Sequence, residues 1–121
     1  MAVIVLVEDM PANRALATKL LVAAGHDVVT ASTGVEGIRL VADRRPDLVL
    51  MDLGLPDIEG REALRTIRTT VPGGRQLKVV AFTAHAMVGD RERALDAGFD
   101  GYVSKPIEFA TFAKSVEALL P

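Results

Sequence analysis

Short apolar runs alternate with helix-like segments five times along this chain, and this alternation limits the possible folds more than any other feature. The runs are rich in Val, Leu and Ile and are bounded by polar or turn residues, which is typical of strands buried on both faces. The alternation predicts a three-layer, doubly wound α/β fold, in which helices cover both faces of a parallel sheet. The five predicted strands are Val3–Val7, His26–Thr30, Leu48–Met51, Leu77–Phe82 and Gly101–Val103.

Five helices are predicted between and after these runs. Pro11 suits the first turn of a helix and Gly25 suits a helix end, while Ser32 or Thr33 can cap a second helix that ends before Pro46. Further helices are predicted over about 62–69, 87–97 and 107–120, the fourth of them polar and weakly packed. The apolar periodicity places Val35, Ile38 and Val41 on the inner side of the second helix, and Phe109, Phe112, Val116 and Leu119 or Leu120 on the last.

Composition limits the class of protein. A chain of 121 residues, half of them apolar, predicts one domain over residues 1–121 with a proper core. The absence of cysteine excludes disulfides and thiol chemistry, and a net charge of −2 with scattered basic residues and few aromatics argues against nucleic-acid binding. No apolar run is long enough to span a bilayer, and the start does not look like a signal peptide. We therefore expect a cytoplasmic protein without a membrane partner.

Polar side chains follow four of the predicted strands. Glu8 and Asp9 follow the first strand, Asp52 the third, Thr83 the fourth, and Lys105 lies just beyond the fifth. Because the carboxyl ends of parallel strands meet at one sheet edge, we expect these groups to converge. Clustered carboxylates repel one another, and Mg²⁺ relieves that repulsion. A lysine and a hydroxyl suit a tetrahedral anion, so the set indicates phosphoryl transfer with an aspartate as the possible nucleophile.

Four motifs carry a resemblance to a known family. They are Val5–Asp9, Asp47–Pro56, Ala81–Ala84 and Gly101–Pro106. In this order and spacing the whole chain resembles a response-regulator receiver domain (CheY-like) of two-component signalling, of the single-domain type. The resemblance implies five parallel strands in the order 2-1-3-4-5 with five helices.

The resemblance also implies a role for each acidic residue. Asp52 resembles the phosphoacceptor, which takes a phosphoryl group from a histidine kinase or a histidine phosphotransfer protein. Asp9 resembles a direct Mg²⁺ ligand, and Glu8 resembles the acid that holds the metal through water. The carbonyl of Gly54 resembles the backbone ligand, and Asp52 itself belongs to the metal site. Mg²⁺ is thus the implied cofactor.

The remaining motif residues resemble the switch of the family. Thr83 resembles the hydroxyl that moves onto the phosphoryl group, and Lys105 resembles the lysine that neutralises its charge. Tyr102 resembles the aromatic that turns inward when Thr83 moves. The bond from Lys105 to Pro106 is expected to be cis, which is inexpensive only before proline. A downstream protein target is implied, and dimerisation through the fourth helix and fifth strand stays open.

Some positions depart from the family pattern or were assigned no role. Leu55 stands where many members have methionine, and Gly54 and His85 occupy positions that tune the lifetime of the phosphorylated state. The stretch Thr83–Met87 looks most like receivers of hybrid kinases and of certain stand-alone regulators. Neither His26 nor His85 has metal-ligand spacing. Arg61, Arg65, Arg68, Arg91, Glu92 and Arg93 are interpreted as solvated helix faces.

Three other functions fit the sequence less well than a signalling switch. A Mg²⁺-dependent phosphatase with an aspartate nucleophile generally needs a second acid two residues later, where this chain has Gly54. A flavin or nucleotide binder needs a phosphate loop after the first strand, but Glu8-Asp9-Met10-Pro11 is acidic. A docking module without acceptor chemistry does not explain the complete acid, threonine and lysine set. Each residue taken alone has a structural explanation, but the set together favours a phosphoacceptor rather than an enzyme with an external substrate.

Overall fold

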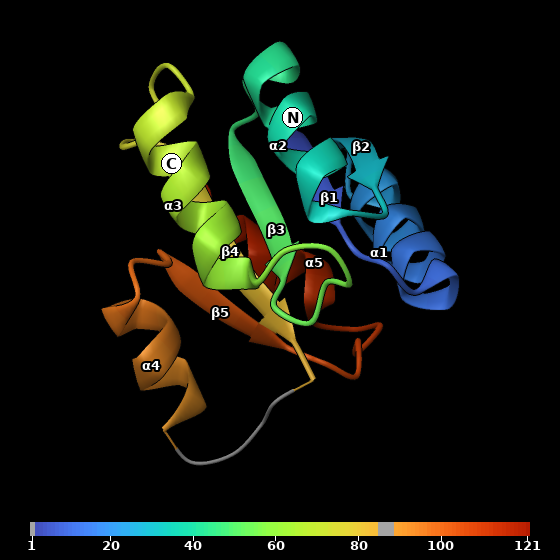
Figure 1. The fold of residues 1–121 in the computed structure, drawn as a ribbon. Coiled ribbons are helices and arrows are strands. Elements are labelled where there is room, and N and C mark those ends of the chain that lie inside the picture. Colours follow the sequence, from blue (N-terminus) through green and yellow to red (C-terminus); the bar gives the residue numbers. More distant parts are fainter. Residues whose placement is uncertain (1, 85–88) are drawn as a thin grey trace.

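The computed structural model describes residues 2–84 and 89–121, which form a single five-stranded sheet with helices on both faces (Figure 1). All neighbouring strands are parallel, and their order is β2-β1-β3-β4-β5, which confirms the predicted fold and strand order. The strands are β1 (Val3–Val7), β2 (Asp27–Ala31), β3 (Leu48–Asp52), β4 (Lys78–Thr83) and β5 (Gly101–Ser104). The helices are α1 (Pro11–Ala23), α2 (Gly34–Arg44), α3 (Gly60–Thr70), α4 (Asp90–Asp96) and α5 (Phe112–Glu117).

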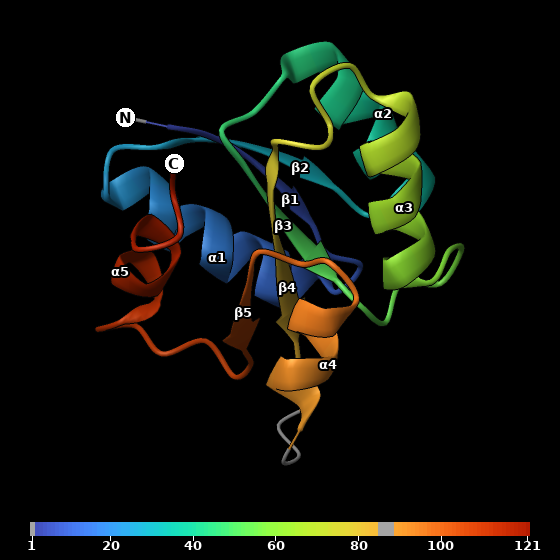
Figure 2. The ribbon, with the colours of Figure 1, turned by 90° about the vertical axis from the view of Figure 1, so that its left-hand side faces the viewer.

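Two hydrophobic cores lie on opposite faces of the sheet. Figure 2 shows α1 and α5 on one face and α2 and α3 on the other. Alternate residues of the central strands point to the two cores: Leu48 and Leu50 join the core under α1 and α5, whereas Val49 and Met51 join the other. Every residue of β3 is buried, because β3 lies in the middle of the sheet. This is the reason for its uninterrupted apolar sequence.

Two residues predicted to lie on inner helix faces are exposed. Val35 is 62% exposed because the buried face of α2 is formed by Gly34, Gly37 and Val41, and Val35 does not lie on that face; Val41 is fully buried as expected. Phe109 is 72% exposed because α5 begins only at Phe112. The preceding segment is a turn, in which the carbonyl of Glu108 accepts the amides of Thr111 and Phe112.

Arg68 was predicted to be solvated, and this prediction is wrong. Its side chain is 19% exposed, and its guanidinium donates hydrogen bonds to the carbonyls of Gly74, Leu77 and Gly98 and to the Asp100 carboxylate. Arg68 thereby ties the end of α3 to the starts of β4 and β5. These partners lie 6 to 32 residues away along the chain, which is why local periodicity gave no sign of them.

The amino end of the sheet carries another buried polar contact. The Nδ1 atom of His26 accepts the amide of Ala2 at 3.1 Å, and Nε2 lies 2.9 Å from a Glu117 carboxylate oxygen. Because Nδ1 is an acceptor, the ring carries its proton on Nε2 and donates it to Glu117. His26 therefore links the starts of β1 and β2 to α5.

Among the described residues, no helix is long and apolar enough to cross a membrane.

Candidate functional site

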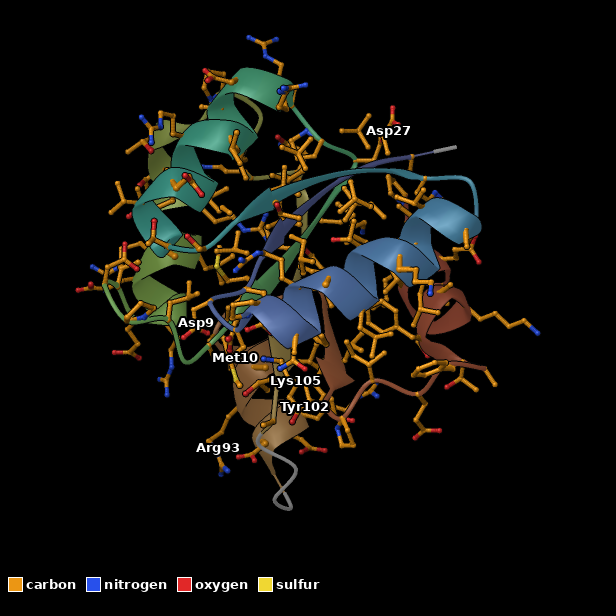
Figure 3. All side chains as sticks on the ribbon, turned by 90° about the vertical axis from the view of Figure 1, so that its right-hand side faces the viewer. Asp9, Met10, Asp27, Arg93, Tyr102 and Lys105 are labelled. Atoms are coloured by element: carbon orange, nitrogen blue, oxygen red, sulfur yellow. The ribbon has the colours of Figure 1, made fainter. Side chains whose placement is uncertain are left out.

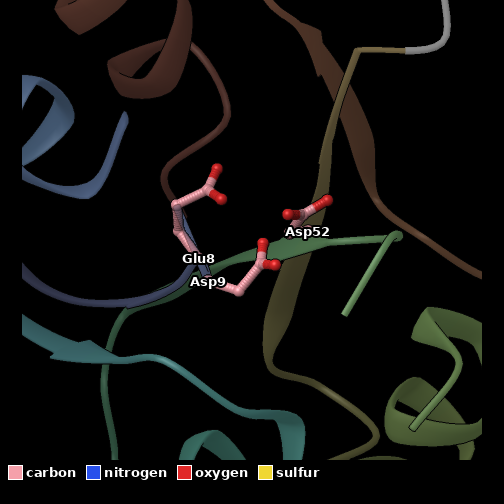
Figure 4. A group of neighbouring side chains, drawn as sticks. All are labelled: Glu8, Asp9 and Asp52. Carbon is pink, nitrogen blue, oxygen red and sulfur yellow. The ribbon is translucent and has the colours of Figure 1, made fainter. Parts of the chain in front are cut away.

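Three carboxylates converge where β1 and β3 end. Glu8 and Asp9 follow β1, Asp52 is the last residue of β3, and each offers an oxygen within 4.8 Å of the others (Figure 4). Glu8 is fully buried and Asp52 is only 6% exposed, whereas Asp9 is partly exposed. The parallel register places Val7 beside Met51, so the residues after the two strands emerge together at one edge. The structure thus brings the predicted acids into one cluster.

Lys105 lies between two of these acids. Its Nζ is 2.5 Å from Oε1 of Glu8 and 3.3 Å from Oδ2 of Asp52, and its side chain is 9% exposed. The same Nζ lies 4.8 Å from the centre of the Phe82 ring. One buried ammonium therefore faces two carboxylates, and Asp9 adds a third acid beside them. The cluster keeps an excess of negative charge that a cation would reduce.

Hydrogen bonds fix Glu8 and Asp52 in the cluster. Oε2 of Glu8 accepts the amide of Met10 at 3.0 Å, and Oδ1 of Asp52 accepts the amide of Gly54 at 2.9 Å. Burial raises the pKa of Glu8 above its usual value of 4.5, and the hydrogen bond from Lys105 opposes that rise. The carboxylates are held by short-range contacts to their own loops, which leaves their remaining lone pairs directed at the cluster.

Thr83 and Tyr102 lie on the far side of the cluster from Glu8. Thr83 ends β4 and is 2% exposed, and its carbonyl accepts the amide of Lys105 at 2.8 Å. Tyr102 on β5 is partly buried, and Figure 3 shows it at the same end of the sheet as Lys105 and Asp9, with Asp27 at the opposite end. Both residues line a cavity of about 210 Å³ that is also lined by residues of α3 and α4.

The Tyr102 phenol is held in a poorly solvated place. Its hydroxyl is buried and has no hydrogen-bond partner among the described residues. Burial, and secondarily the charge of Asp90, raise the pKa of Tyr102 above 10.0. The phenol of Tyr102 is thus partly buried beside the cavity, in surroundings that disfavour its ionised form.

The other predicted features are the peptide bond before Pro106, the position of Gly54, and the segment that includes His85 and Met87. The Lys105–Pro106 peptide bond is cis, as expected. Gly54 directly follows the acid cluster in the loop between β3 and α3. His85 and Met87 lie outside the described residues.

Two residues that the sequence did not single out support the site. The guanidinium of Arg14 on α1 donates to the carbonyls of Glu8 and Asp9 at 2.9 and 3.4 Å. The carboxylate of Asp57 accepts two amides at the start of α2, although Asp57 belongs to the loop after β3. Turn residues from 54 to 60 predicted a loop there, but nothing in the sequence indicated which distant amides Asp57 would reach.

Comparison with known proteins identifies the family. The family model described as "response regulator receiver domain" matches residues 4–117. The chain belongs to the response regulator receiver family. Receivers are the signalling domains of two-component response regulators, so the resemblance expected from the four sequence motifs is confirmed.

Individual relatives cover nearly the whole receiver. The polar-differentiation response regulator DivK of Brucella anthropi is 35% identical over 117 residues, which span 97% of this chain and 94% of that protein. The receiver domain of the sensor histidine kinase PA1611 of Pseudomonas aeruginosa is 35% identical with a TM-score of 0.86, and the match covers 98% of this chain and 96% of that one. Chemotaxis protein CheY4 of Vibrio cholerae, at 23% identity, a TM-score of 0.89 and 99% coverage of both chains, shares the fold.

The donor set of this receiver fits a hard divalent cation. The PA1611 structure is described with a magnesium ion coordinated in its active-site cleft. In this chain the corresponding chemistry is an all-oxygen set of three carboxylates, without nitrogen or sulfur donors among the clustered groups. Mg²⁺ prefers oxygen ligands and binds through one or two carboxylates together with water and phosphate oxygens. The acid cluster therefore offers the kind of ligand that Mg²⁺ prefers.

Proposed function

We propose that this receiver accepts a phosphoryl group on Asp52 in a Mg²⁺-dependent reaction and thereby switches a protein-binding surface. The observation that carries the proposal is the position of Asp52: a nearly buried carboxylate at the end of the central strand, with Oδ2 3.3 Å from the Lys105 ammonium and two further acids beside it. A structural ion pair needs no second and third carboxylate. A phosphoacceptor site uses all of them.

The proposed reaction transfers a phosphoryl group from a phosphohistidine of a histidine kinase or phosphotransfer protein. The phosphorus–nitrogen bond breaks as a bond forms between phosphorus and an Asp52 oxygen, and the donor imidazole recovers its electron pair and takes up a proton. Oδ2 of Asp52 is the proposed nucleophile, because Oδ1 already accepts the Gly54 amide at 2.9 Å. That hydrogen bond holds the carboxylate in one orientation, so positioning supplies much of the rate.

Mg²⁺ and Lys105 would each neutralise part of the negative charge on the transferred phosphoryl group. Bound Mg²⁺, held by Asp9, Asp52, the Gly54 carbonyl and, through water, Glu8, would neutralise charge on the phosphoryl oxygens and orient them. Lys105 would exchange its contact with Asp52 for a phosphoryl oxygen, while its contact with Glu8 at 2.5 Å holds the ammonium in place. This arrangement explains why a buried lysine faces two carboxylates rather than one.

The proposed switch joins the site to the cavity between α3, α4 and β5. Thr83 would move its hydroxyl toward the phosphoryl group, and Tyr102 would turn into the space beside it, since both residues line that cavity. Phosphorylation adds charge and strong acceptor oxygens, which can bias such a two-state element. The changed surface near α4 and β5 would bind a downstream protein, or a second receiver.

Intact-protein mass spectrometry tests the acceptor. The receiver is incubated with acetyl phosphate, with and without Mg²⁺, as wild type and as Asp52→Asn. We expect one added phosphoryl group that requires Mg²⁺ and is absent from Asp52→Asn. Asp47→Asn is the matched control, because this carboxylate also accepts a backbone amide, that of Val3 at 2.8 Å, but at the opposite end of the sheet. Absence of the adduct with acetyl phosphate and with a phosphorylated histidine kinase, while Mg²⁺ still binds, would favour a docking module instead.

A further inference from the structure

The carboxylate of Asp57 fastens the loop after β3 to the start of α2. Oδ1 accepts the amide of Gly34 at 2.9 Å, and Oδ2 accepts the amide of Val35 at 3.0 Å. These amides belong to the first two residues of α2, where the helix leaves its N–H groups without internal partners. The hydrogen bond from the Val35 amide, and after it the one from Gly34, lower the pKa of Asp57 below 3.8. The Asp57 carboxylate, which clamps the loop to α2, is therefore ionised at neutral pH.

Side-chain packing closes the same contact. A Cβ atom on Gly34 would lie 2.0 Å from Cγ2 of Ile58 and 3.4 Å from both Cδ1 of Leu55 and Oδ1 of Asp57. Three residues of the loop therefore surround this one glycine. Because Cγ2 of Ile58 branches from Cβ, it cannot move aside as the tip of a long side chain could. The loop and the start of α2 interlock, and Gly34 must be glycine for them to do so.

The clamped loop is the one that carries Gly54. At its beginning, the Gly54 amide is held by Oδ1 of Asp52 at 2.9 Å, and three residues later Asp57 is held by α2. The loop is thus tied at both ends. The Gly54 carbonyl belongs to the peptide between Gly54 and Leu55, which lies inside this tied stretch, and groups that orient ligands affect metal affinity.

We propose that Asp57 is a positioning residue of the metal site: by clamping the loop to α2, it holds the peptide of Gly54 ready to bind Mg²⁺. This inference rests on the proposed function, in which the Gly54 carbonyl is a ligand. It gives α2 a part in metal binding, although none of its residues belongs to the acid cluster. Asp57 acts through the backbone of the loop and touches neither metal nor phosphoryl group.

The chain offers a matched control for this proposal. Thr33 is the N-cap of the same helix, and its hydroxyl accepts the amide of Glu36 at 3.2 Å. Thr33→Ala therefore weakens the start of α2 without removing a contact to the loop. Asp57→Ala removes both hydrogen bonds of the clamp, whereas Asp57→Asn keeps the shape and an acceptor oxygen and is expected to rescue part of the effect.

Two measurements on these variants separate positioning from general stability. Calorimetric titration with Mg²⁺ alone gives the affinity. NMR relaxation of the Leu55 amide without metal gives the order of the peptide that carries the Gly54 carbonyl, because this amide and that carbonyl share one peptide plane. For Asp57→Ala we expect a more mobile Leu55 amide and about 3- to 10-fold weaker Mg²⁺ binding. This loss of affinity is smaller than the roughly 10- to 100-fold effect typical of groups that directly contact a metal-binding side chain. Thr33→Ala is expected to match wild type in Mg²⁺ affinity and in loop order, although it loses about as much stability toward urea as Asp57→Ala does.

The outcomes are distinct. If Asp57→Ala leaves the Leu55 amide as ordered as in wild type, or if Thr33→Ala weakens Mg²⁺ binding equally, the clamp is not a positioning device and the inference is wrong. If the Leu55 amide becomes mobile in Asp57→Ala but Mg²⁺ affinity is unchanged, Asp57 does not serve the metal and the inference is again wrong. If wild type binds no Mg²⁺, the proposed function fails first, and the inference fails with it.

Discussion

Replacement of Arg68 by alanine is expected to destabilise this receiver more than any other change at a partly exposed position of α3. The guanidinium donates to the carbonyls of Gly74 at 2.7 Å, Leu77 at 2.5 Å and Gly98 at 3.1 Å, and to Asp100 at 2.8 Å. A hydrogen bond from a charged group contributes about 1.5–3 kcal/mol when well buried. Because the Arg68 side chain is partly exposed, water competes for the same donors and acceptors, and each bond contributes less than this range. We therefore expect the four bonds together to contribute about 3 kcal/mol to the free energy of unfolding.

Urea unfolding followed by circular dichroism measures this loss. We expect Arg68→Ala to lower the free energy of unfolding by about 3 kcal/mol, and Arg65→Ala, at an exposed position one turn earlier on α3, to change it by less than about 0.5 kcal/mol. Arg68→Lys keeps the charge but lacks the planar fork that reaches several acceptors, so it should recover only a minor part. A loss under about 1 kcal/mol for Arg68→Ala would refute the reasoning, because the four hydrogen bonds would then contribute little to stability. Full recovery by lysine would refute it as well, because the positive charge alone would then account for the effect.

Three further predictions concern single groups. Tyr102 is the only tyrosine and the chain has no tryptophan, so ultraviolet absorbance follows the ionisation of this side chain directly. We expect a pKa of Tyr102 above 10.0, and a lower pKa in Asp90→Asn. The neutral phenol therefore contributes stability below pH 10, and this contribution is lost as pH rises through the raised pKa. Burial raises the pKa of Glu8 above 4.5, so its contribution to stability is full below that pH and is lost as pH rises. Glu8→Gln is therefore expected to stabilise the metal-free protein against urea at neutral pH, by up to about 2 kcal/mol, while weakening Mg²⁺ binding in a calorimetric titration. On α1, Leu21 is fully buried and Val22 is 53% exposed, so Leu21→Ala should cost about 2–5 kcal/mol in unfolding experiments and Val22→Ala almost nothing; equal losses would contradict the assigned helix face.

The sequence was most informative where burial leaves a periodic pattern. The continuous apolar run of β3 predicted a central strand, and the polar residues after successive strands predicted which groups would meet at the carboxyl edge. The structure brings Glu8, Asp9, Asp52 and Lys105 together as expected. The strand order came from the family resemblance, because periodicity does not encode which strands are neighbours.

The sequence was least informative at helix ends and for long-range polar contacts. The predicted last helix began at Ile107 with Phe109 on its apolar stripe, but residues 109–111 form a turn before α5, so Phe109 projects into solvent. Arg68 and Asp57 look like ordinary surface charges in the sequence, because their partners come from other loops and helices. A one-dimensional pattern shows how polar a position is, but not which distant backbone groups it will contact.

The two edges of the sheet are subject to different constraints. At the carboxyl edge, carboxylates crowd together at a cost to stability, whereas at the amino edge Asp47 binds the amide of Val3, and His26 and Arg68 form networks that link strands to helices. A relative without the proposed phosphoryl chemistry would be released from the first constraint but not from the second. In such a lineage the acids after β1 and β3 would drift while His26, Asp47 and Arg68 persisted, so comparing the two edges among relatives would distinguish retained signalling from retained folding.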